Sequence, residues 1–402
     1  MTWTKAPLGD LLSYIGKGVA PKYTDDSSAA DSVMVLGQKC VRNQSVVYAE
    51  ARFHDEAAKS FKPEKVVCPG DILVNATGVG SAGRVAQIVD APSRKCITDG
   101  HVITLRSSDR IDPVYLGYFV KSKQVLIEQM AEGSTGQTEM NRTRLQNEVL
   151  VTFPESNEDQ KTIAEFGLAI DRKIATNAKL NGYLEELFDS CFKQSLDMAD
   201  ETWDTASLLD IADYKNGLAM QKFRPNIGDK GLPVLKIREL GQESCGKDAE
   251  RCRSDIDESV TVHDGDLVFS WSGTLLLKFW AGGDAGLNQH LFKVTSGVYP
   301  SWFYYAWTKH HLARFTMLAK DRATTMGHIK RSALEESEVL LPPKEKLTMQ
   351  TKCMQPIIDQ VIANKIEIRK LAALRDALLP KLMSGEIDVS KIGLTQLNSH
   401  LS

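Results

Sequence analysis

The chain repeats itself once, in the same order, over nearly its whole length. The stretch PGDILVNATG at residues 69–78 returns as DGDLVFSWSG at 264–273. Further along, NRTRLQNEVLVTFP at 141–154 returns as KRSALEESEVLLPP at 330–343. A duplication on this scale predicts two globular units of the same fold, related by pseudo-symmetry and offering two equivalent places for binding.

The spacing of the repeat changes along the chain. Three matching pairs show this, with offsets of 200, 189 and 192 residues: Trp3 with Trp203, His101 with His290 and Lys173 with Lys365. Because the offset first falls and then partly recovers, insertions and deletions lie inside the globular parts. We therefore expect the two units to share a framework and to differ in their loops.

Composition restricts the class of protein. With 402 residues, 42% of them hydrophobic and 25% charged, the chain has the profile of an ordinary globular protein of two or more domains. It has no apolar run near the roughly 20 residues of a membrane span. Residues 1–10 lack the basic start and apolar stretch of a secretion signal. Seven cysteines without a CxxC pair argue against a zinc site or a disulfide framework, so we expect a cytoplasmic protein with free thiols.

Each globular unit mixes strands and helices. Residues 1–153 contain short β-branched runs separated by Gly, Pro and Asp turns, and residues 202–343 repeat that pattern. Asp112 and Pro113 are typical of a helix start, and the helix they open is expected to close at Gly133. Pro300 opens the counterpart helix in the second unit.

Two long segments, at about 157–194 and 345–384, carry a seven-residue apolar period instead. The first series contains Ile163, Ile170, Asn177, Leu184 and Cys191, with Phe166, Leu180 and Leu187 three positions after some of them. The second contains Ile357, Asn364, Leu371 and Leu378, alongside Met354, Val361 and Ile368. Each predicts an amphipathic helix, and the order unit, helix, unit, helix favours antiparallel packing of the two.

Asn177 and Asn364 are the polar members of these series. They either fix the register of the helix pair or lie at the edge of a slightly shifted stripe. Pro380 is expected to kink or end the second helix near Leu379.

The predicted fold class is thus α+β, with two similar globular domains in tandem, separated by two long helices packed as an antiparallel coiled coil with pseudo-two-fold symmetry. The expected divisions are a first domain at 1–154, a central helix at 155–198, a second domain at 199–343, a C-terminal helix at 344–390 and a flexible tail at 391–402.

Two motifs that suggest nucleotide chemistry lack the context it needs. GVGSAG at residues 78–83 matches a dinucleotide-binding turn, but a strand pattern follows where a helix is required, so we expect a hairpin. GQESCGK at 241–247 resembles a phosphate-binding loop, yet Asp248 stands where a hydroxyl should bind magnesium. His101 and His290 recur at matching places and are expected to be hydrogen-bonded structural residues. The residues therefore predict neither a catalytic site nor a bound cofactor or metal.

Charge is unevenly distributed despite a net value of −3. The segment from Lys309 to Arg331 contains six basic residues and one acidic residue, a local excess of positive charge that is typical of a phosphate-binding surface. The matching stretch of the first unit carries only a small excess. Both stretches contain a polar loop, EGSTGQTEMNRTR at 132–144 and DRATTMGHIKR at 321–331, with side chains that can read bases or hold phosphates. For any single residue, the alternative is a solvated loop that caps the next helix. The candidate DNA contacts are Arg84, Gln137, Asn141, Arg142, Arg144, Lys278, Arg314, Lys320, Arg322, His328, Lys330 and Arg331.

Three stretches are distinctive: the terminal LRDALLPKLMSGEIDV at 374–389, and the two that close the globular units, GQTEMNRTRLQNEVLVTFP and TTMGHIKRSALEESEVLLPP. In these stretches the chain resembles the DNA-specificity subunits of type I restriction-modification systems. The terminal stretch is similar to the end of that family's distal conserved region. The central helix departs from the terminal one, because YLEELFDSCFKQSLD lacks the Leu-Pro-Lys-Leu and Ser-Gly-Glu elements.

The resemblance implies a non-catalytic subunit that binds double-stranded DNA at a bipartite site. Each target-recognition domain would read one half, and the helices would set the gap. Two methylation subunits carrying S-adenosylmethionine would dock on it, and restriction motor-nuclease subunits using ATP and magnesium would join for cleavage. A self-contained methyltransferase or nuclease with duplicated domains is the alternative from another class. A structural protein that only oligomerises through its coiled coil is a third.

Overall fold

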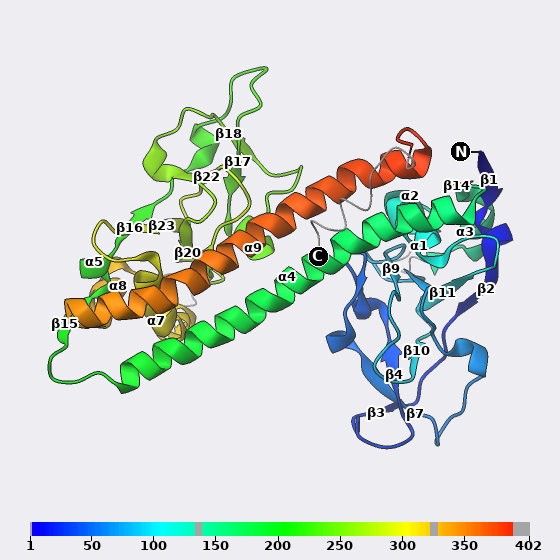
Figure 1. The fold of residues 1–402 in the computed structure, drawn as a ribbon, viewed down its shortest axis with the longest axis horizontal. Coiled ribbons are helices and arrows are strands. Elements are labelled where there is room, and N and C mark those ends of the chain that lie inside the picture. Colours follow the sequence, from blue (N-terminus) through cyan, green and yellow to red (C-terminus); the bar gives the residue numbers. More distant parts are fainter. Residues whose placement is uncertain (1, 133–138, 322–328, 389–402) are drawn as a thin grey trace. The chain divides into compact units, whose positions relative to one another are not determined.

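The computed structural model describes residues 2–132, 139–321 and 329–388 and divides the chain into two compact units (Figure 1). Unit 1 comprises Met1–Asp171 and Leu374–Ser402, and unit 2 comprises Arg172–Ala373. Each of the two long helices contributes to both units. The remaining elements of each unit form one copy of the repeat.

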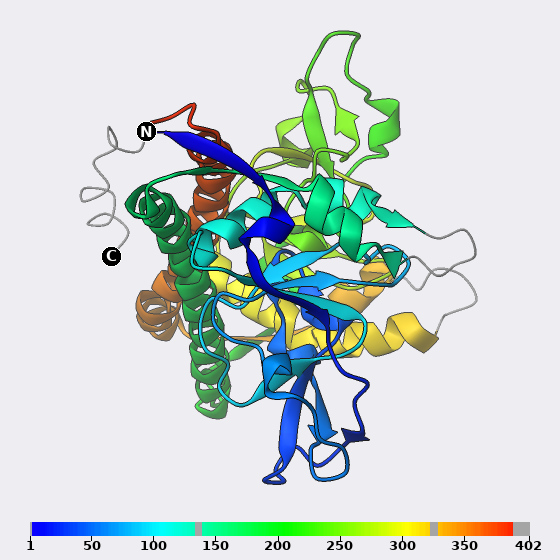
Figure 2. The same ribbon diagram turned by 90° about the vertical axis from the view of Figure 1, so that its right-hand side faces the viewer.

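Unit 1 is built on two four-stranded sheets, coloured blue to cyan in Figure 2. The first is antiparallel, in the order β2 (Leu12–Lys17), β11 (Val102–Ser107), β8 (Ile72–Asn75) and β9 (Val85–Gln87). The second is mixed, in the order β10 (Cys96–Thr98), β4 (Ser32–Leu36), β7 (Arg52–Asp55) and β3 (Tyr23–Thr24), with β10 and β4 parallel. Strand β1 (Trp3–Pro7) pairs with β14 (Leu150–Pro154), so the two ends of the domain meet in one ladder.

The predicted helix start in unit 1 is confirmed. Asp112 caps α1 (Pro113–Ser122) by accepting hydrogen bonds from the backbone N–H groups of Val114 and Tyr115, both at 2.9 Å. The helix then breaks at Lys123, and α2 (Gln124–Gln129) ends before the expected position at Gly133. Short elements complete the unit: β5 (Val41–Arg42), β6 (Ser45–Val46), β12 (Ala131–Glu132), β13 (Glu139–Met140) and α3 (Arg142–Glu148).

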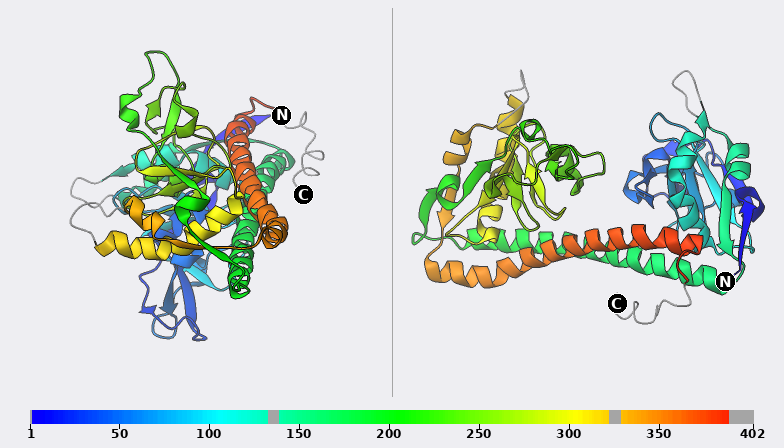
Figure 3. Two further views of the ribbon diagram at one scale, coloured as in Figure 1. Left: turned by 90° about the vertical axis from the view of Figure 1, so that its left-hand side faces the viewer. Right: turned by 90° about the horizontal axis from the view of Figure 1, so that it is seen from above.

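Unit 2, drawn green to yellow in the left panel of Figure 3, repeats the antiparallel sheet strand for strand and keeps the parallel pair of the mixed sheet, whose edge strands differ. Its antiparallel sheet has the order β16 (Asp213–Asn216), β23 (Leu291–Thr295), β20 (Leu267–Ser270) and β21 (Leu277–Phe279). Its mixed sheet has the order β18 (Arg251–Cys252), β17 (Leu232–Leu235), β22 (Ala285–Leu287) and β19 (Thr261–Val262). The parallel pair recurs as β17 and β22, and β15 (Asp204–Ser207) pairs with β24 (Glu338–Leu341). The helices are α5 (Leu208–Ile211), α6 (Ile237–Gln242), α7 (Ser301–Asp321) and α8 (Arg331–Glu335).

The glycine-rich stretch at 78–83 forms the turn between β8 and β9, as expected for a hairpin. Gly78, Gly80 and Gly83 have φ values of 110°, 69° and 84°, which side chains with a Cβ rarely adopt. The stretch at 241–247 begins in the last two residues of α6 and does not lead into a helix. Neither stretch has the strand–loop–helix geometry that these motifs require.

The long helices α4 (Asn157–Asp197) and α9 (Lys344–Ser384) are present as predicted. In unit 2 the two helices run antiparallel, because residues with increasing numbers on α4 are hydrogen-bonded to residues with decreasing numbers on α9. The pairs are Asn177 with Glu367, Asn181 with Asn364, and Ser195 with Gln350. Figure 1 and the right panel of Figure 3 show the two helices side by side there. The fold class predicted from the sequence is therefore confirmed for its domains and its helix pair.

The predicted stripe on α4 needs a correction in its second half. Leu180 and Leu187, expected in the seam, are 40% and 49% exposed, whereas Asn181 and Phe188 are 6% and 1% exposed. A straight helix has 3.6 residues per turn, so its inward face drifts away from a strict seven-residue repeat. The buried series accordingly moves one position later.

Pro380, expected to kink or end the second helix, does not end it, because α9 continues to Ser384. A proline removes one helical hydrogen bond, but burial of the flanking residues can offset that loss. Leu379, Leu382 and Met383 are at most 8% exposed and anchor this last turn in unit 1. The Tyr115 hydroxyl donates to the Thr152 carbonyl at 2.9 Å and lies 3.4 Å from the Met383 carbonyl.

The core of unit 2 unites the domain with both long helices. It contains the aromatic side chains of Trp302, Phe303 and Phe315 from α7 together with Phe188 of α4 and Ile358 of α9. Burial of each such side chain contributes roughly 1.5–3 kcal/mol. The helices are thus part of the domain's own hydrophobic core. None of the helices in the described ranges is long and apolar enough to cross a membrane.

Candidate nucleic-acid interface

The basic candidates of unit 2 lie where α7 ends and α8 begins. Lys320 belongs to the last turn of α7, Lys330 is the N-cap residue of α8, and Arg331 is its first residue. All three side chains are exposed, and none forms an ion pair with an acidic residue in the ranges that the structure describes. Their charges are therefore available to a ligand.

Arg314 has a different position. Its guanidinium donates from Nη2 to the Ala333 carbonyl at 3.0 Å and to the Ser337 hydroxyl at 2.5 Å, which holds the end of α8 against α7. These two bonds use the Nη2 group of Arg314 within the fold. The sequence could not indicate this, because Ala333 and Ser337 are about twenty residues away along the chain.

In unit 1 the corresponding residues surround α3. Asn141 caps this helix by accepting from the backbone N–H groups of Thr143 at 3.0 Å and Arg144 at 3.2 Å. Arg144 forms an ion pair with Glu148 one turn later, at 2.8 Å. Arg142 is exposed and forms no ion pair among the described residues, although after Lys17 its charge also helps to lower the pKa of Glu139. It occupies the same place at the start of α3 that Arg331 occupies at the start of α8.

The other candidates are dispersed. Arg84 donates to the Gly80 carbonyl at 2.8 Å and closes its own turn. Lys278 lies 3.2 Å from Glu243, which also binds Lys365 of α9 at 2.9 Å. Burial favours a raised pKa for Glu243, but the two lysines outweigh it and lower the pKa. Gln137, Arg322 and His328 lie outside the described residues.

A hydroxyl-histidine pair recurs beside both candidate surfaces. In unit 1 the His101 Nδ1 lies 2.9 Å from the Thr77 hydroxyl, and in unit 2 the His290 Nδ1 lies 3.0 Å from the Ser272 hydroxyl. These histidines are hydrogen-bonded, as expected from their repetition. The hydroxyl partners were missed in the sequence, although Thr77 and Ser272 also occupy matching positions of the repeat.

Both asparagines predicted to set register are 4% exposed, but they do not bond each other. Asn177 donates to Glu367 at 2.6 Å, and Asn364 donates to Asn181 at 2.8 Å. Asn181 was missed, although its position one helical turn after Asn177 is the signal that could have indicated it. Whether these residues fix register stays a prediction.

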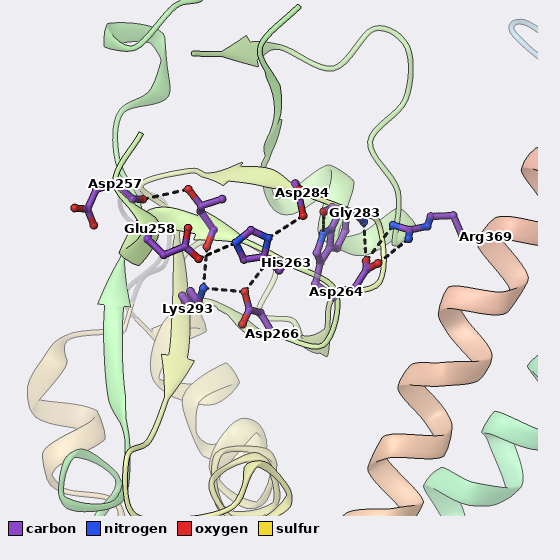
Figure 4. A network of polar contacts seen from close by, with 11 residues as sticks. Asp257, Glu258, His263, Asp264, Asp266, Gly283, Asp284, Lys293 and Arg369 are labelled. Carbon is purple, nitrogen blue, oxygen red and sulfur yellow. Dashed lines mark hydrogen bonds and ion pairs between the residues drawn. The ribbon is translucent and has the colours of Figure 1, made fainter. Parts of the chain in front are cut away.

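A polar network links the outer turns of unit 2 to α9 (Figure 4). Arg369 extends from α9 and binds both carboxylate oxygens of Asp264, at 3.0 and 2.6 Å, and Asp264 also accepts from the Gly283 N–H at 2.8 Å. The neighbouring His263 ring lies between Asp284 and Glu258, each at 2.8 Å. The hydrogen bond to Asp284 raises the pKa of His263, and Glu258 adds to that effect against the opposing influence of burial.

A buried charge cluster links the domain of unit 1 to its helices. Asp171 of α4 accepts from the Tyr118 hydroxyl at 2.6 Å and from Arg375 of α9 at 2.5 Å. Burial lowers the pKa of nearby Lys121 to about 8, although Asp171 opposes that shift. No group of His, Cys, Asp and Glu side chains within the described ranges is arranged to hold a metal ion.

Comparison with known proteins places these features in a family. The chain matches the type I restriction modification DNA specificity domain over residues 1–186 and 200–375. It is 24% identical over 316 residues to the type I restriction enzyme MjaIX specificity subunit of Methanocaldococcus jannaschii, with 71% of each chain covered. It is 22% identical over 213 residues to the EcoBI specificity subunit of Escherichia coli, covering 52% of this chain and 44% of that relative.

The fold is also shared with a solved structure. The type I restriction-modification system S subunit from M. genitalium superposes with a TM-score of 0.60 at 17% identity, covering 95% of this chain and 96% of that one. One family match falls on each copy of the repeat, and together they span most of the sequence. The chain therefore belongs to the family of type I restriction-modification DNA specificity proteins.

Proposed function

We propose that this chain is the DNA-specificity subunit of a type I restriction-modification complex and that each globular unit reads one half of a bipartite DNA site. The relatives it resembles are specificity subunits by name. The subunit itself carries out no chemistry. It acts in the cytoplasm by selecting where its partners act.

One observation carries this proposal: both units present an exposed arginine at the same place in the same fold. Arg142 begins α3 and Arg331 begins α8, and each follows a polar segment that differs between the units. Arginine at such a position suits a phosphate or the edge of a guanine. Two equivalent positions on different loops suit two half-sites of different sequence.

The helices have two roles in this proposal. The antiparallel pairing of α4 and α9 sets the separation of the half-sites, and its outer faces bind two methylation subunits. Those subunits carry S-adenosylmethionine, and restriction motor-nuclease subunits with ATP and magnesium join for cleavage. If the half-sites occupy neighbouring major grooves, their centres lie roughly 34 Å apart.

The first experiment maps methylated adenines across a genome with and without this gene. A bipartite motif that depends on the gene is expected. Absence of any gene-dependent motif, or methyl transfer or cleavage by the purified chain without partners, would overturn the proposal. The second outcome would favour a self-contained enzyme.

The second experiment tests the exposed basic residues in the complex with the methylation subunits. The Lys330→Ala, Arg331→Ala double variant is expected to weaken binding and to lower the slope of log affinity against log salt by about one to two. Arg142→Ala, at the corresponding position of unit 1, is the control: it should leave recognition of the second half-site unaffected. Equal losses at both half-sites from either variant would contradict independent reading.

A further inference from the structure

We propose that His101 and His290 are phosphate anchors: each contacts the DNA backbone through Nε2 at its own half-site, in unit 2 in place of the Gln289 amide nitrogen that lies 3.4 Å from His290 Nε2, and positions the domain without reading bases. This inference rests on the proposed DNA-binding function and concerns residues outside the basic stretches. It comes from a geometry that occurs once in each unit.

The two histidines occupy equivalent positions in equivalent strand pairs of the two units. In unit 1 the Ala76 N–H donates to the His101 carbonyl at 2.7 Å, one residue beyond the β8–β11 pairing of Asn75 with Val102. In unit 2 the Trp271 N–H donates to the His290 carbonyl at 3.3 Å, one residue beyond the pairing of Ser270 with Leu291. In both cases the next residue of the partner strand supplies the hydroxyl.

The turn before each histidine is also the same. The His101 N–H donates to the Asp99 side chain at 2.9 Å, and the His290 N–H donates to the Asn288 side chain at 3.3 Å. The chain closes these turns with hydrogen bonds from Val102 to the Asp99 carbonyl and from Leu291 to the Asn288 carbonyl, at 3.1 and 3.0 Å. An Asx side chain at the first turn position is the usual way to fix such a turn. Each imidazole is therefore held in place by its backbone and by its Nδ1.

The hydrogen bonds in unit 1 allow the tautomer that the proposal requires. The Gln38 amide contacts both the Thr77 carbonyl, at 2.7 Å, and the Thr77 hydroxyl. A carbonyl only accepts, so the Gln38 group at this point is its NH₂, and the hydroxyl accepts from it. The Thr77 hydroxyl can then donate its own proton to His101 Nδ1, and in that arrangement the proton of the neutral ring is on Nε2. His101 is exposed and its Nε2 has no partner among the described residues, whereas His290 is half-buried and its Nε2 lies 3.4 Å from Gln289 Nε2.

Both histidines lie beside the segments predicted to contact DNA. The Met140 N–H, within the first polar stretch at 132–144, donates to the Ala76 carbonyl at 2.6 Å. The Ile329 N–H, within the second at 321–331, donates to the Trp271 carbonyl at 3.0 Å. Ala76 and Trp271, the residues that pair with the two histidines, thus also bind the backbone of the adjacent polar stretch.

The repetition indicates what the histidines contact. The segments 133–138 and 322–328 have different sequences, GSTGQT and RATTMGH, and so suit different bases. A residue held by the same backbone and Nδ1 contacts in both readers suits a ligand common to both half-sites. Phosphate is such a ligand, and contacts to it fix position and register without sequence information.

The test uses the full chain assembled with its methylation subunits, bound to a duplex that carries the mapped target. His101→Ala is expected to weaken binding roughly tenfold, the size of one hydrogen bond to a charged group. Discrimination against a changed base in either half-site should stay as in the wild type. His101→Gln, whose amide nitrogen can replace Nε2, should recover most of the affinity.

Duplexes with a single neutral methylphosphonate then identify the phosphate. In the wild type one position in each half-site should weaken binding. His101→Ala should abolish that effect in the first half-site only, and His290→Ala in the second only, so each variant is the control for the other. His101→Ala should leave thermal stability unchanged.

Three results would overturn the inference: unchanged affinity of both alanine variants, loss of base discrimination at one half-site, or weaker binding at both half-sites together with a lower melting temperature. Failure of the DNA-specificity role itself would look different. In that case the wild-type complex would show no preference for any bipartite duplex, before any histidine is changed.

Discussion

Replacing the buried Asn181–Asn364 pair by leucine, singly and together, tests whether a polar contact specifies the helix pairing of unit 2. The two side chains are 6% and 4% exposed, and the Asn364 amide donates to Asn181 Oδ1 at 2.8 Å. Asn364 also accepts from Gln360 at 2.7 Å, and Asn181 donates to the Val361 carbonyl at 3.3 Å. The pair therefore satisfies most of its own polar atoms inside the seam.

The expected magnitudes follow from these bonds. Asn364→Leu leaves the buried Asn181 Oδ1 without its donor, a loss of about 1–3 kcal/mol that the added apolar surface offsets only in part. Asn181→Leu should be destabilising for the same reason. The double variant removes both polar groups, so its free energy of unfolding should be close to the wild-type value or higher. The coupling energy should be about 2 kcal/mol.

Urea unfolding followed by tryptophan fluorescence measures this cycle. Five of the six tryptophans, all except Trp3, belong to unit 2, so the signal reports the unit that contains the pair. If the double variant loses as much stability as the two single variants combined, the asparagines do not interact and the reasoning is wrong. If the pair fixes register, the stable double variant should also bind duplexes with altered spacers that the wild type rejects.

Three further predictions concern other contacts. Asp284 raises the pKa of His263, so the protonated ring stabilises unit 2 fully at pH values below its ordinary pKa of 6.5, and this stability is lost as the pH rises through the raised pKa. His263→Gln should remove that part of the pH dependence, which thermal melts between about pH 6 and 8 would measure. Arg369→Gln breaks the ion pair with Asp264, whose two side chains are 34% and 27% exposed, so the free energy of unfolding should change by less than about 1 kcal/mol. The same variant should weaken the preference of the complex for DNA with the native spacer over DNA whose spacer is one base pair longer or shorter. Gly117→Ala places a Cβ 1.9 Å from Gln87 Oε1, so thermal or urea unfolding should show a loss of about 1–3 kcal/mol, and an unaltered midpoint would refute the packing argument.

Local rules in the sequence were sufficient for several elements. Asp112 and Pro113 marked a helix start because a cap and a fixed φ act within one turn. The long helices followed from their apolar period. The order of strands in the sheets did not follow, since pairing β4 with β10 joins residues about sixty positions apart and no local pattern encodes that contact.

The candidate contacts show the same division between local and distant information. Residue type and spacing correctly placed Lys320, Lys330 and Arg331 on the surface. They could not show that Arg314 holds α8 in place. That role depends on which acceptors the fold brings within about 3 Å. The capping of α3 by Asn141, in contrast, acts within one turn and agrees with the alternative of a loop that caps the next helix.

Comparison of the two repeats distinguishes the structural features that both domains share from the segments in which they differ. Strand register, the turn before the histidine and the hydroxyl on its Nδ1 are the same in both units, down to the step of the ladder. The polar loops beside them share neither sequence nor charge. Shared donors at fixed places suit the phosphates that every half-site offers, and differing side chains suit the bases that distinguish one half-site from the other. Two domains built this way can be positioned on DNA by the same contacts while they read different sequences.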